Sequence, residues 1–335
     1  MSRHPDPHLA PLAELLPAFP RATVVVIGDY VADEYVYGET ERISREAPVL
    51  IVRYERSELK AGGAGNAAQN LAALGVAVRA VGLVGDDELG RRLLGELRRG
   101  GIGVAGLQRV RGRATESKTR ILAGGRSTRR QQMLRVDRAP QPLPAAVERR
   151  LLADLQRASR GASAVLASDY GSGVLSPRVI EALRGLRRQG IPVCVDSRYN
   201  LRSFSGLTMV KPNEPELEAA SGISLAAPGG LLKAARALQR RLSCEHLLVT
   251  RGRFGMSLFR RGEPPLHIGA HGKKEAVDVT GAGDTVAATY CAAIASGADG
   301  EAAARLANVA GSLVVQKPGT ATVTREELKP ELIGS

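Results

Sequence analysis

The strongest constraint on the fold is a regular alternation of short apolar runs with longer amphipathic stretches. The run at residues 23–28 (TVVVIG) is rich in β-branched residues and ends in glycine, which is typical of a buried strand. Similar runs lie at residues 76–85, 164–167, 191–195, 208–210 and 247–250. Apolar residues at helical spacing lie between them, at 66–74, 88–99, 143–159, 177–189 and 231–242. This order predicts an α/β fold with a doubly wound, mainly parallel sheet and helices on both faces.

Two segments, at residues 35–54 and 117–137, break the alternation because they contain no helical stretch. Apolar and polar residues alternate in both, as is typical of antiparallel strands with one exposed face. Each segment leaves a core element and returns to it. We therefore expect a small inserted β lid, at about residues 34–56 and 116–138, within a single domain at residues 21–335. A flexible, Pro-rich N-terminus is expected at residues 1–20.

Composition limits the classes of partner. With 44% hydrophobic and 24% charged residues, the 335-residue chain is not of a disordered or collagen-like class. Its net charge of +13 suits phosphorylated, anionic metabolites, with nucleic acid as the competing explanation. Aromatic residues are only 3% of the chain, too few for a base-stacking surface, and the basic residues are scattered. We therefore expect small-molecule partners and no nucleic acid.

The cysteines and the N-terminal residues bear on the cellular compartment of the protein. Cys194, Cys244 and Cys291 lie in apolar runs without metal-ligand spacing, as expected of buried thiols in a reducing environment. The first twenty residues hold several prolines and lack the apolar segment of a signal peptide. No apolar run approaches the roughly 18 residues of a membrane span. A cytoplasmic protein without membrane contact is the resulting expectation.

The most specific motif is DVTGAGDT at residues 278–285. Apolar residues follow it at helical spacing, so Gly281, Ala282 and Gly283 are predicted to form a turn that opens a helix. The free N–H groups and the positive end of the helix dipole would form an anion hole there. Asp284 falls in the first turn, where its carboxylate could accept a proton from a hydroxyl that attacks phosphorus. An isolated GAGD is more often a simple turn, so its assignment to an anion hole depends on other motifs in the chain.

With a second motif, GGAGN at residues 62–66, this string resembles the ribokinase-like (PfkB) family of sugar kinases. The likeness extends from residue 23 to about 324. It implies that Asp284 is the catalytic base, that Gly281 to Gly283 form the anion hole, and that Gly62, Gly63 and Asn66 belong to the sugar site. The glycine pair could equally be a tight strand-to-helix turn.

The same resemblance implies ATP and Mg²⁺ as cofactors. Asn213 and Glu216 match the family's N-x-x-E motif, which acts around Mg²⁺ and the phosphates. By their spacing alone they predict a helix start with a capping box, and both interpretations can hold together. Further implied nucleotide contacts are Asp196, Thr250, Gly252 and Gly255. Asp278 and Thr280 are candidate ligands of a monovalent cation such as K⁺.

The acceptor side is predicted around the first strand. Asp29 and Asp33 follow it at the carboxyl edge, where open α/β sheets bind ligands. The resemblance makes them ligands of sugar hydroxyls, although Asp29 could equally be a turn residue. Substrate-binding candidates on the lid are Arg42, Lys118, Arg120, Gln132 and Arg135. Charged residues on such a lid are commonly only a solvated face.

Strings at residues 28–49, 131–137 and 168–170 are similar to one subgroup, the heptose 7-phosphate kinases of lipopolysaccharide-core synthesis. These transfer the γ-phosphoryl group of ATP to the anomeric hydroxyl of D-glycero-D-manno-heptose 7-phosphate. Arg42, Lys118 and Arg120 would then grip the substrate phosphate. The chain departs from the subgroup at Arg45, Gly65, Ser172 and the Asp196-Ser197-Arg198 string, and its lid insertion at residues 124–130 is longer.

Two alternatives remain open. One is a PfkB kinase for another sugar, sugar phosphate or nucleoside, and the other is a catalytically weak sugar-binding regulator on the same fold. The nucleotidyltransferase motif H-x-G-H is absent from the sequence, so a kinase-only protein is expected. Family resemblance and the exposed edges of a β lid also predict a homodimer.

Overall fold

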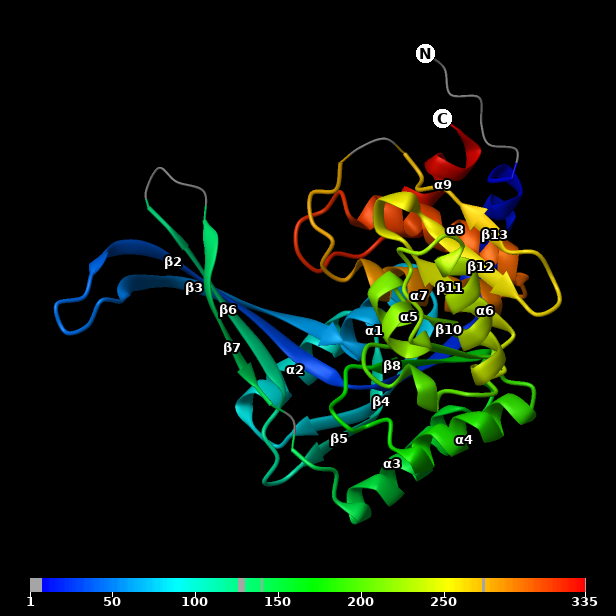
Figure 1. The fold of residues 1–335 in the computed structure, drawn as a ribbon. Helices are drawn as coiled ribbons and strands as arrows, with labels where there is room; N and C mark the ends of the chain where they lie inside the picture. Colours follow the sequence, from blue (N-terminus) through cyan, green and yellow to red (C-terminus); the bar gives the residue numbers. More distant parts are fainter. Residues whose placement is uncertain (1–7, 126–129, 140, 273–274, 335) are drawn as a thin grey trace.

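The computed structural model describes residues 8–125, 130–139, 141–272 and 275–334, and it contains a large central sheet and a smaller projecting sheet (Figure 1). The α-helices are α1 Ala64–Ala73, α2 Glu88–Arg99, α3 Ala145–Ala158, α4 Pro177–Arg188, α5 Glu214–Ser221, α6 Gly230–Leu242, α7 Ala282–Ala295, α8 Gly300–Val314 and α9 Arg325–Ile333. Short 3-10 helices are η1 Ala10–Arg21, η2 Leu201–Ser203 and η3 Gly252–Phe254. The strands are β1 Thr23–Gly28, β2 Tyr30–Ile43, β3 Leu50–Gly63, β4 Ala77–Gly85, β5 Gly103–Val110, β6 Ser117–Gly124, β7 Gln131–Arg138, β8 Ala164–Asp169, β9 Val193–Ser197, β10 Met209–Lys211, β11 His246–Thr250, β12 Met256–Arg260 and β13 Leu266–Ile268.

The central sheet has the order β13-β12-β11-β10-β9-β8-β1-β4-β5. Every pair from β11 to β5 is parallel, and only β12 and β13 join antiparallel at one edge. The predicted doubly wound, mainly parallel sheet is therefore confirmed. The parallel strands end at one common edge, which gathers residues from distant parts of the chain.

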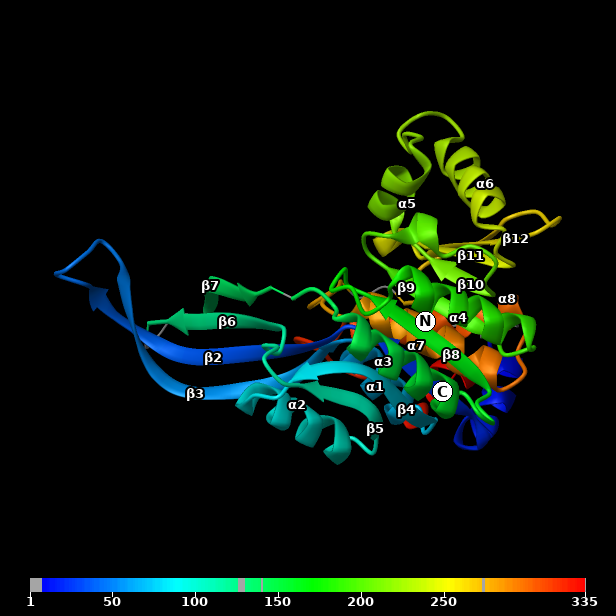
Figure 2. The same cartoon turned by 90° about the horizontal axis from the view of Figure 1, so that it is seen from below.

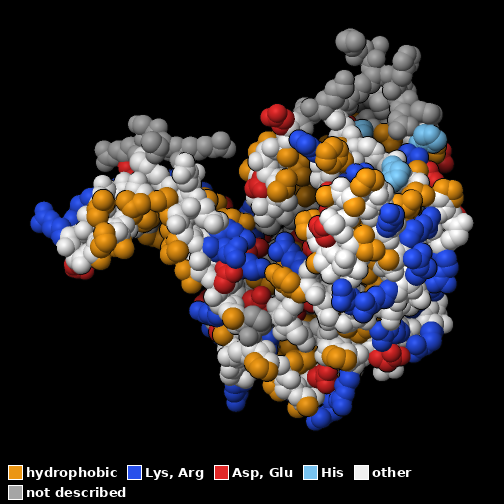
Figure 3. Space-filling model, in the orientation of Figure 1, with side chains coloured by type: hydrophobic (Ala, Val, Ile, Leu, Met, Phe, Trp, Pro, Cys, Tyr) orange, Lys and Arg blue, Asp and Glu red, His pale blue; other side chains and the backbone are white. Residues whose placement is uncertain are grey.

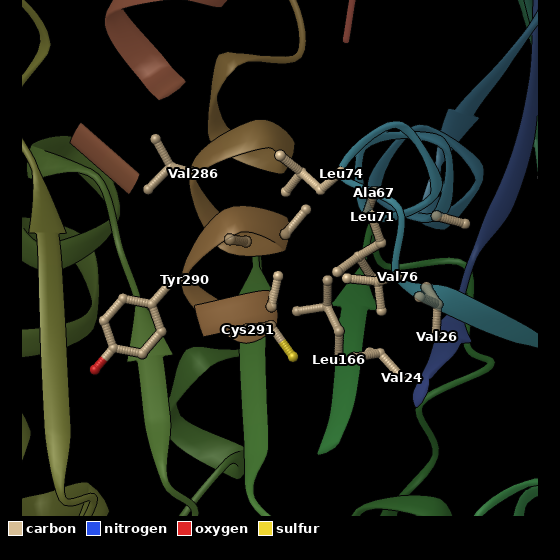
Figure 4. Packing of buried hydrophobic residues seen from close by; sticks show 14 of the residues in the cluster. Val24, Val26, Ala67, Leu71, Leu74, Val76, Leu166, Val286, Tyr290 and Cys291 are labelled. Atoms are coloured by element: carbon tan, nitrogen blue, oxygen red, sulfur yellow. The ribbon is translucent and has the colours of Figure 1, made fainter. Parts of the chain in front are cut away.

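Each face of the central sheet carries its own apolar core. Val24 and Val26 of β1 belong to one cluster, and Val25 and Ile27 belong to the other, because successive side chains of a strand point to opposite faces. Helices α1, α7 and α8 cover the first face, where Figure 4 shows Leu71 of α1 and Cys291 of α7 above the strands. Helices α3, α4 and α6 cover the second face. This arrangement fixes α7 rigidly on the sheet.

The projecting sheet is the predicted lid, with the order β3-β2-β6-β7 (Figures 1 and 2). The pairs β2–β3 and β6–β7 are antiparallel, as the alternating patterns indicate. The two hairpin-like segments are joined by a parallel pair, β2–β6, which places Asp33 opposite Lys118. That parallel pair was not predicted, because alternation within one segment carries no information about its partner.

The N-terminal segment differs from its prediction as a flexible stretch. Helix η1 covers residues 10–21, and Leu12, Leu16 and Phe19 are buried on its inner side against α9 and the first core. Their i, i+4, i+7 spacing is that of an amphipathic helix, which the number of prolines concealed. Residues 1–7 lie outside the described residues. Within the described part of the chain, no helix combines the length and apolar character needed to cross a membrane.

Candidate active site

The site is built around the start of α7, at the carboxyl edge of the central sheet. Gly281 is its N-cap residue with φ 78°, a left-handed conformation that favours glycine. A Cβ atom at Gly281 would also lie 2.6 Å from the Asn66 side-chain nitrogen. Two independent constraints thus require glycine here. The following turn presents the N–H groups of an α-helix start, as the motif predicts.

Asp284 lies in the first turn of α7 and is only 4% exposed. Its Oδ2 accepts a 2.7 Å hydrogen bond from the Asn66 side-chain amide of α1. The Tyr170 hydroxyl donates to Oδ1 and Oδ2 at 2.9 and 3.1 Å. Burial, with the nearby Asp196 carboxylate, raises the pKa of Asp284 to about 6, against the effect of these hydrogen bonds and of Lys211. A carboxylate with a pKa close to neutrality is well matched to general-base chemistry.

A buried cation lies beside the anion hole. The Lys211 ammonium is 2.9 Å from Asp196 Oδ1, and both side chains are nearly inaccessible to solvent. A Cβ atom at Gly283 would lie 3.4 Å from the Lys211 nitrogen, so this glycine leaves the cation close to the helix start. Burial opposes its charge, but Asp196 and Glu216 raise the pKa of Lys211. Lys211 was missed in the sequence, although it lies only two residues before Asn213 of the N-x-x-E motif.

A cleft of about 940 Å³ opens in front of α7. This volume is in the range of small-molecule sites. The structure brings the predicted nucleotide residues together here, since the lining includes Asp196, Asn213, Glu216, Thr250, Gly252 and Gly255 along with residues 281–284.

The predicted capping box at the start of α5 is confirmed. The Asn213 side chain accepts from the Glu216 N–H, and the Glu216 carboxylate accepts from the Asn213 N–H, both at 2.8 Å. Burial raises the pKa of Glu216, while Lys211 opposes the shift. Glu216 therefore caps the helix and at the same time turns a carboxylate towards the cleft that it lines.

On the acceptor side, Asp33 pairs with Arg120 across the lid at 2.6 Å. A Cβ atom at Gly62 would lie 2.2 Å from Asp33 Oδ2, so glycine leaves room for this carboxylate. Gly63 has φ 58° where β3 meets α1. The tight-turn interpretation therefore holds for Gly63, and the turn places Asn66 against Asp284, while a sugar contact of the glycine pair stays a prediction.

Asp29 has a local structural task. Its carboxylate accepts hydrogen bonds from the N–H groups of Tyr170, Ser172 and Val174, at 2.8, 3.1 and 3.3 Å. Burial raises its pKa to about 6, against the effect of these bonds. Asp29 lies between β1 and β2, and its carboxylate holds the loop at residues 170–174 that follows β8, while its contact with a sugar hydroxyl stays a prediction.

The lid candidates divide into two groups. Lys118 lies 5.3 Å from the centre of the Tyr170 ring, and Arg120 is held by Asp33, so both belong to the site. Arg42 is exposed near the far end of β2, which Figure 1 shows projecting away from the body. Gln132 and Arg135 are exposed on the edge strand β7, where Arg135 pairs with Asp137 at 2.8 Å. In the described residues, no hydrogen bond or ion pair connects these three with Asp284 or its partners, and their assignment to the substrate site stays a prediction.

The candidate cation ligands lie in a turn of their own. The Asp278 carboxylate accepts from the N–H groups of Thr280 and Gly319, at 2.9 and 2.8 Å, and thereby ties two loops together. These bonds hold its pKa below the usual value, although burial opposes the shift. Over the described ranges there is no group of three or more His, Cys, Asp or Glu side chains that could hold a metal ion.

Two departures from the subgroup pattern lie near the site. Ser172 donates a hydrogen bond to Glu116, and Arg198 lies 4.9 Å from the centre of the Tyr170 ring. Arg198 thus supplies a cation at the cleft. Part of the lengthened lid insertion, residues 126–129, lies outside the described residues. Tyr170 itself was not among the predicted site residues, because only the S-D-Y string marked it.

Comparisons with known proteins agree with this arrangement. A family model described as "pfkB family carbohydrate kinase" matches residues 21–327. The chain is 43% identical over 310 residues to bifunctional protein HldE of Pelobacter propionicus, covering 92% of this chain and 62% of the relative. It is also 43% identical over 321 residues to bifunctional protein HldE of a Caulobacter species, covering 95% and 64%. The chain therefore spans about three fifths of the length of these relatives.

Solved structures show the same fold. Ribokinase from Arabidopsis thaliana, complexed with ribose and ATP, has a TM-score of 0.72 at 22% identity, covering 94% of this chain and 99% of the other. Phosphofructokinase-2 from Escherichia coli, in complex with potassium, has a TM-score of 0.75 at 20% identity, covering 93% and 97%.

Proposed function

The chain belongs to the pfkB family of carbohydrate kinases, and from this premise we propose that it phosphorylates the anomeric hydroxyl of D-glycero-D-manno-heptose 7-phosphate. The chain is an ATP-dependent sugar kinase. The heptose acceptor is supported by the motifs at residues 28–49 and 168–170 and by the similarity to proteins named HldE. The observation that carries the proposal is the buried Asp284 beside an anion hole and a buried lysine.

The geometry supports a direct phosphoryl transfer. Asp284 accepts the proton of the anomeric hydroxyl as the sugar oxygen forms its bond to the γ-phosphorus. The bond from that phosphorus to the β–γ bridging oxygen breaks, and ADP leaves with the electron pair. The N–H groups at residues 281–283 and the Lys211 ammonium face the charge that develops on the transferred group. Burial of Asp284 excludes water that would compete as the acceptor.

Mg²⁺ fits this site without a dedicated cage of side chains. In kinases this ion is bound by one or two carboxylates together with substrate phosphates and water. Glu216 and Asp196 both line the cleft and supply such carboxylates. When bound, Mg²⁺ neutralises charge on the phosphates. A monovalent cation at the turn of Asp278 and Thr280 remains part of the proposal.

The acceptor phosphate needs a cation at the far end of the sugar from Asp284, because the anomeric hydroxyl and the 7-phosphate lie at opposite ends of the heptose. Lys118 is the predicted lid residue best placed for this, because its ammonium rests over the ring of Tyr170, which lies between it and the base. Arg120 is largely engaged by Asp33. We propose Lys118 and Arg198 as the contacts of the sugar phosphate and the transferred phosphate, respectively.

A homodimer formed through the lid is also part of the proposal. The lid carries exposed apolar side chains, including Ile43, Leu50, Tyr54, Leu134 and Val136. Figure 3 shows such side chains, in orange, along the projecting sheet. β3 and β7 are the two edge strands of the lid. The backbone N–H and C=O groups on their outer sides could pair with a second copy of the chain. A cytoplasmic location is supported by the three buried free cysteines.

The test is ATP consumption with Mg²⁺ against a panel of sugars and sugar phosphates, with Asp284→Asn as the control. We expect turnover on D-glycero-D-manno-heptose 7-phosphate, lowered by about 10² or more in Asp284→Asn, which should remain folded. Turnover on a different panel member would discard the heptose and keep the kinase. Near-normal turnover in the variant would remove Asp284 from its role.

A second acceptor is favoured by one observation. Ser172 stands where the heptose subgroup usually has lysine, and its hydroxyl is committed to Glu116. A kinase for another sugar or sugar phosphate is therefore the alternative that the same panel tests. Failure of every acceptor would favour the sugar-binding regulator, although the intact base and anion hole argue against it.

A further inference from the structure

Tyr170 makes three kinds of contact at the centre of the site. Its hydroxyl donates to both carboxylate oxygens of Asp284. The Lys118 ammonium, from lid strand β6, lies 5.3 Å from the centre of its ring. The Arg198 guanidinium, just after β9, lies 4.9 Å from the same point. One side chain thus contacts the base and two cations that come from different parts of the fold.

The backbone around Tyr170 is held firmly in place. Asp29 accepts from the N–H groups of Tyr170 and Ser172. Asp169 accepts from the Gly171 N–H at 3.1 Å and from the Ser197 hydroxyl at 2.6 Å. Two buried carboxylates therefore fix this loop from both neighbouring strands, β1 and β8. Burying two carboxylates costs free energy, and this is expected where they hold a functional side chain, here Tyr170, in one position.

We propose that Tyr170 is a positioning residue for the catalytic base: its neutral hydroxyl orients Asp284 and stabilises the ionised carboxylate, and its ring sets Lys118 and Arg198 beside that carboxylate. The inference rests on the proposed function, in which Asp284 accepts the proton of the acceptor. It adds a residue that neither the family motifs nor the sequence pattern assigned to the site.

The chemistry requires Tyr170 to remain a donor. Burial and the adjacent Asp284 raise the pKa of Tyr170 well above its ordinary value, so the hydroxyl keeps its proton. A hydrogen bond donated to a carboxylate favours the ionised form. The other groups facing Asp284 are Asn66 from α1, Asp196 from β9, Arg198 just after β9 and Lys211 from β10. Asn66, Arg198 and Lys211 also favour ionisation, whereas burial and Asp196 oppose it.

The matched variants are Tyr170→Phe, which removes only the hydroxyl, and Tyr199→Phe. Tyr199 lies against Gly171 of the same loop but is 76% exposed, so it serves as the control. The first readout does not need a substrate: the protonated carboxyl of Asp284 is titrated by infrared difference spectroscopy in the ligand-free protein, with Asp284→Asn assigning the band. We expect the midpoint to move to higher pH in Tyr170→Phe and to stay unchanged in Tyr199→Phe.

The second readout is the pH profile of kcat/KM for the acceptor that turns over. In Tyr170→Phe the acidic limb should move to higher pH, with a loss of roughly tenfold at pH 6 and a smaller loss at pH 8. A purely structural role would lower activity equally at all pH values. If Tyr170→Phe does not fold, 3-fluorotyrosine at position 170, a stronger donor, should move the infrared midpoint to lower pH.

The outcomes separate the two claims. An infrared midpoint that is the same in wild type and Tyr170→Phe overturns the role of Tyr170, even when Asp284→Asn abolishes turnover. Near-normal turnover in Asp284→Asn overturns the proposed function instead, whatever the infrared titration gives.

Discussion

At the scale of single residues, the site depends on carboxylates that the fold buries. Asp284 must be ionised to accept a proton, yet it is 4% exposed and close to Asp196. The hydrogen bonds from Asn66 and Tyr170 compensate only in part, since the pKa of Asp284 is still raised to about 6. The base is therefore held in a state that favours reactivity over folding stability.

This conflict predicts a pH-dependent gain in stability for Asp284→Asn. A carboxyl whose folded pKa exceeds its unfolded value stabilises the fold below the unfolded pKa, and this contribution is lost as pH rises through about 6. The amide avoids the loss and can keep both hydrogen bonds. We expect the variant to be more stable than wild type by up to about 3 kcal/mol at pH 8.

Thermal or urea unfolding at pH 4, 6 and 8 checks this expectation. The difference in stability between the two proteins should shrink towards pH 4. As the pH falls, Asp284 becomes protonated in the folded wild-type chain and increasingly also in the unfolded chain, so its charge no longer destabilises the fold. A variant that is less stable than wild type at pH 8 would show that the ionised carboxylate makes a net stabilising contribution to the fold.

At the scale of elements, helix starts concentrate the chemistry. The start of α7 presents the anion hole and the base, and the start of α5 presents Glu216 within a capping box. Both starts lie at the carboxyl edge of the sheet and line the same cleft. Glu216 can act as a helix cap, as a ligand towards Mg²⁺ and phosphate, or as both. A variant that removes only its charge separates the two roles.

Glu216→Gln should keep the cap, because a glutamine oxygen can still accept from the Asn213 N–H. It removes the charge that would act on Mg²⁺. We expect an unchanged melting temperature, a lower kcat and a higher Mg²⁺ requirement. Glu216→Ala should in addition lose about 1 kcal/mol of stability with the cap. Normal kinetics in Glu216→Gln, measured across Mg²⁺ concentrations, would leave only the capping role.

At the scale of the whole molecule, the outer part of the lid lies outside both apolar cores, and only its base, with Tyr30, Ala32 and Ala61, belongs to the first one. The lid extends from the body as a thin sheet (Figure 2), and all of β7 is exposed. On one face, Leu134, Ile121 and Val36 lie opposite one another on three successive strands. Leu134 is exposed and the other two are half-buried, and such an apolar row on a sheet with open edges is typical of a surface that a second molecule covers.

We therefore expect a dimer in sedimentation equilibrium at micromolar concentration, and a monomer for the double variant Leu134→Lys, Val136→Lys. Leu232→Lys on α6 is the control, because Leu232 is also an exposed apolar residue but lies outside the lid. A wild-type chain that sediments only as a monomer, or a double variant that remains a dimer, would contradict assembly through the lid.

Much of the site was predictable because its determinants are local. The turn at residues 281–283, the position of Asp284 and the capping box of Asn213 and Glu216 follow from glycine, helix spacing and short-range hydrogen bonds. The alternation of strands and helices likewise determined the fold class, since the hydrophobic periodicity of each segment indicates whether it is a strand or a helix.

Only the tertiary structure decided which distant residues meet. Asn66 reaches Asp284 across 218 positions of the chain, and Tyr170 reaches it across 114. Lys211 joins Asp196 because β9 and β10 are neighbours in the sheet, and Lys118 lies by Asp33 because β2 and β6 pair in parallel. Such contacts depend on strand order and register, which are set by the packing of the whole chain and leave no periodic signal in any single segment.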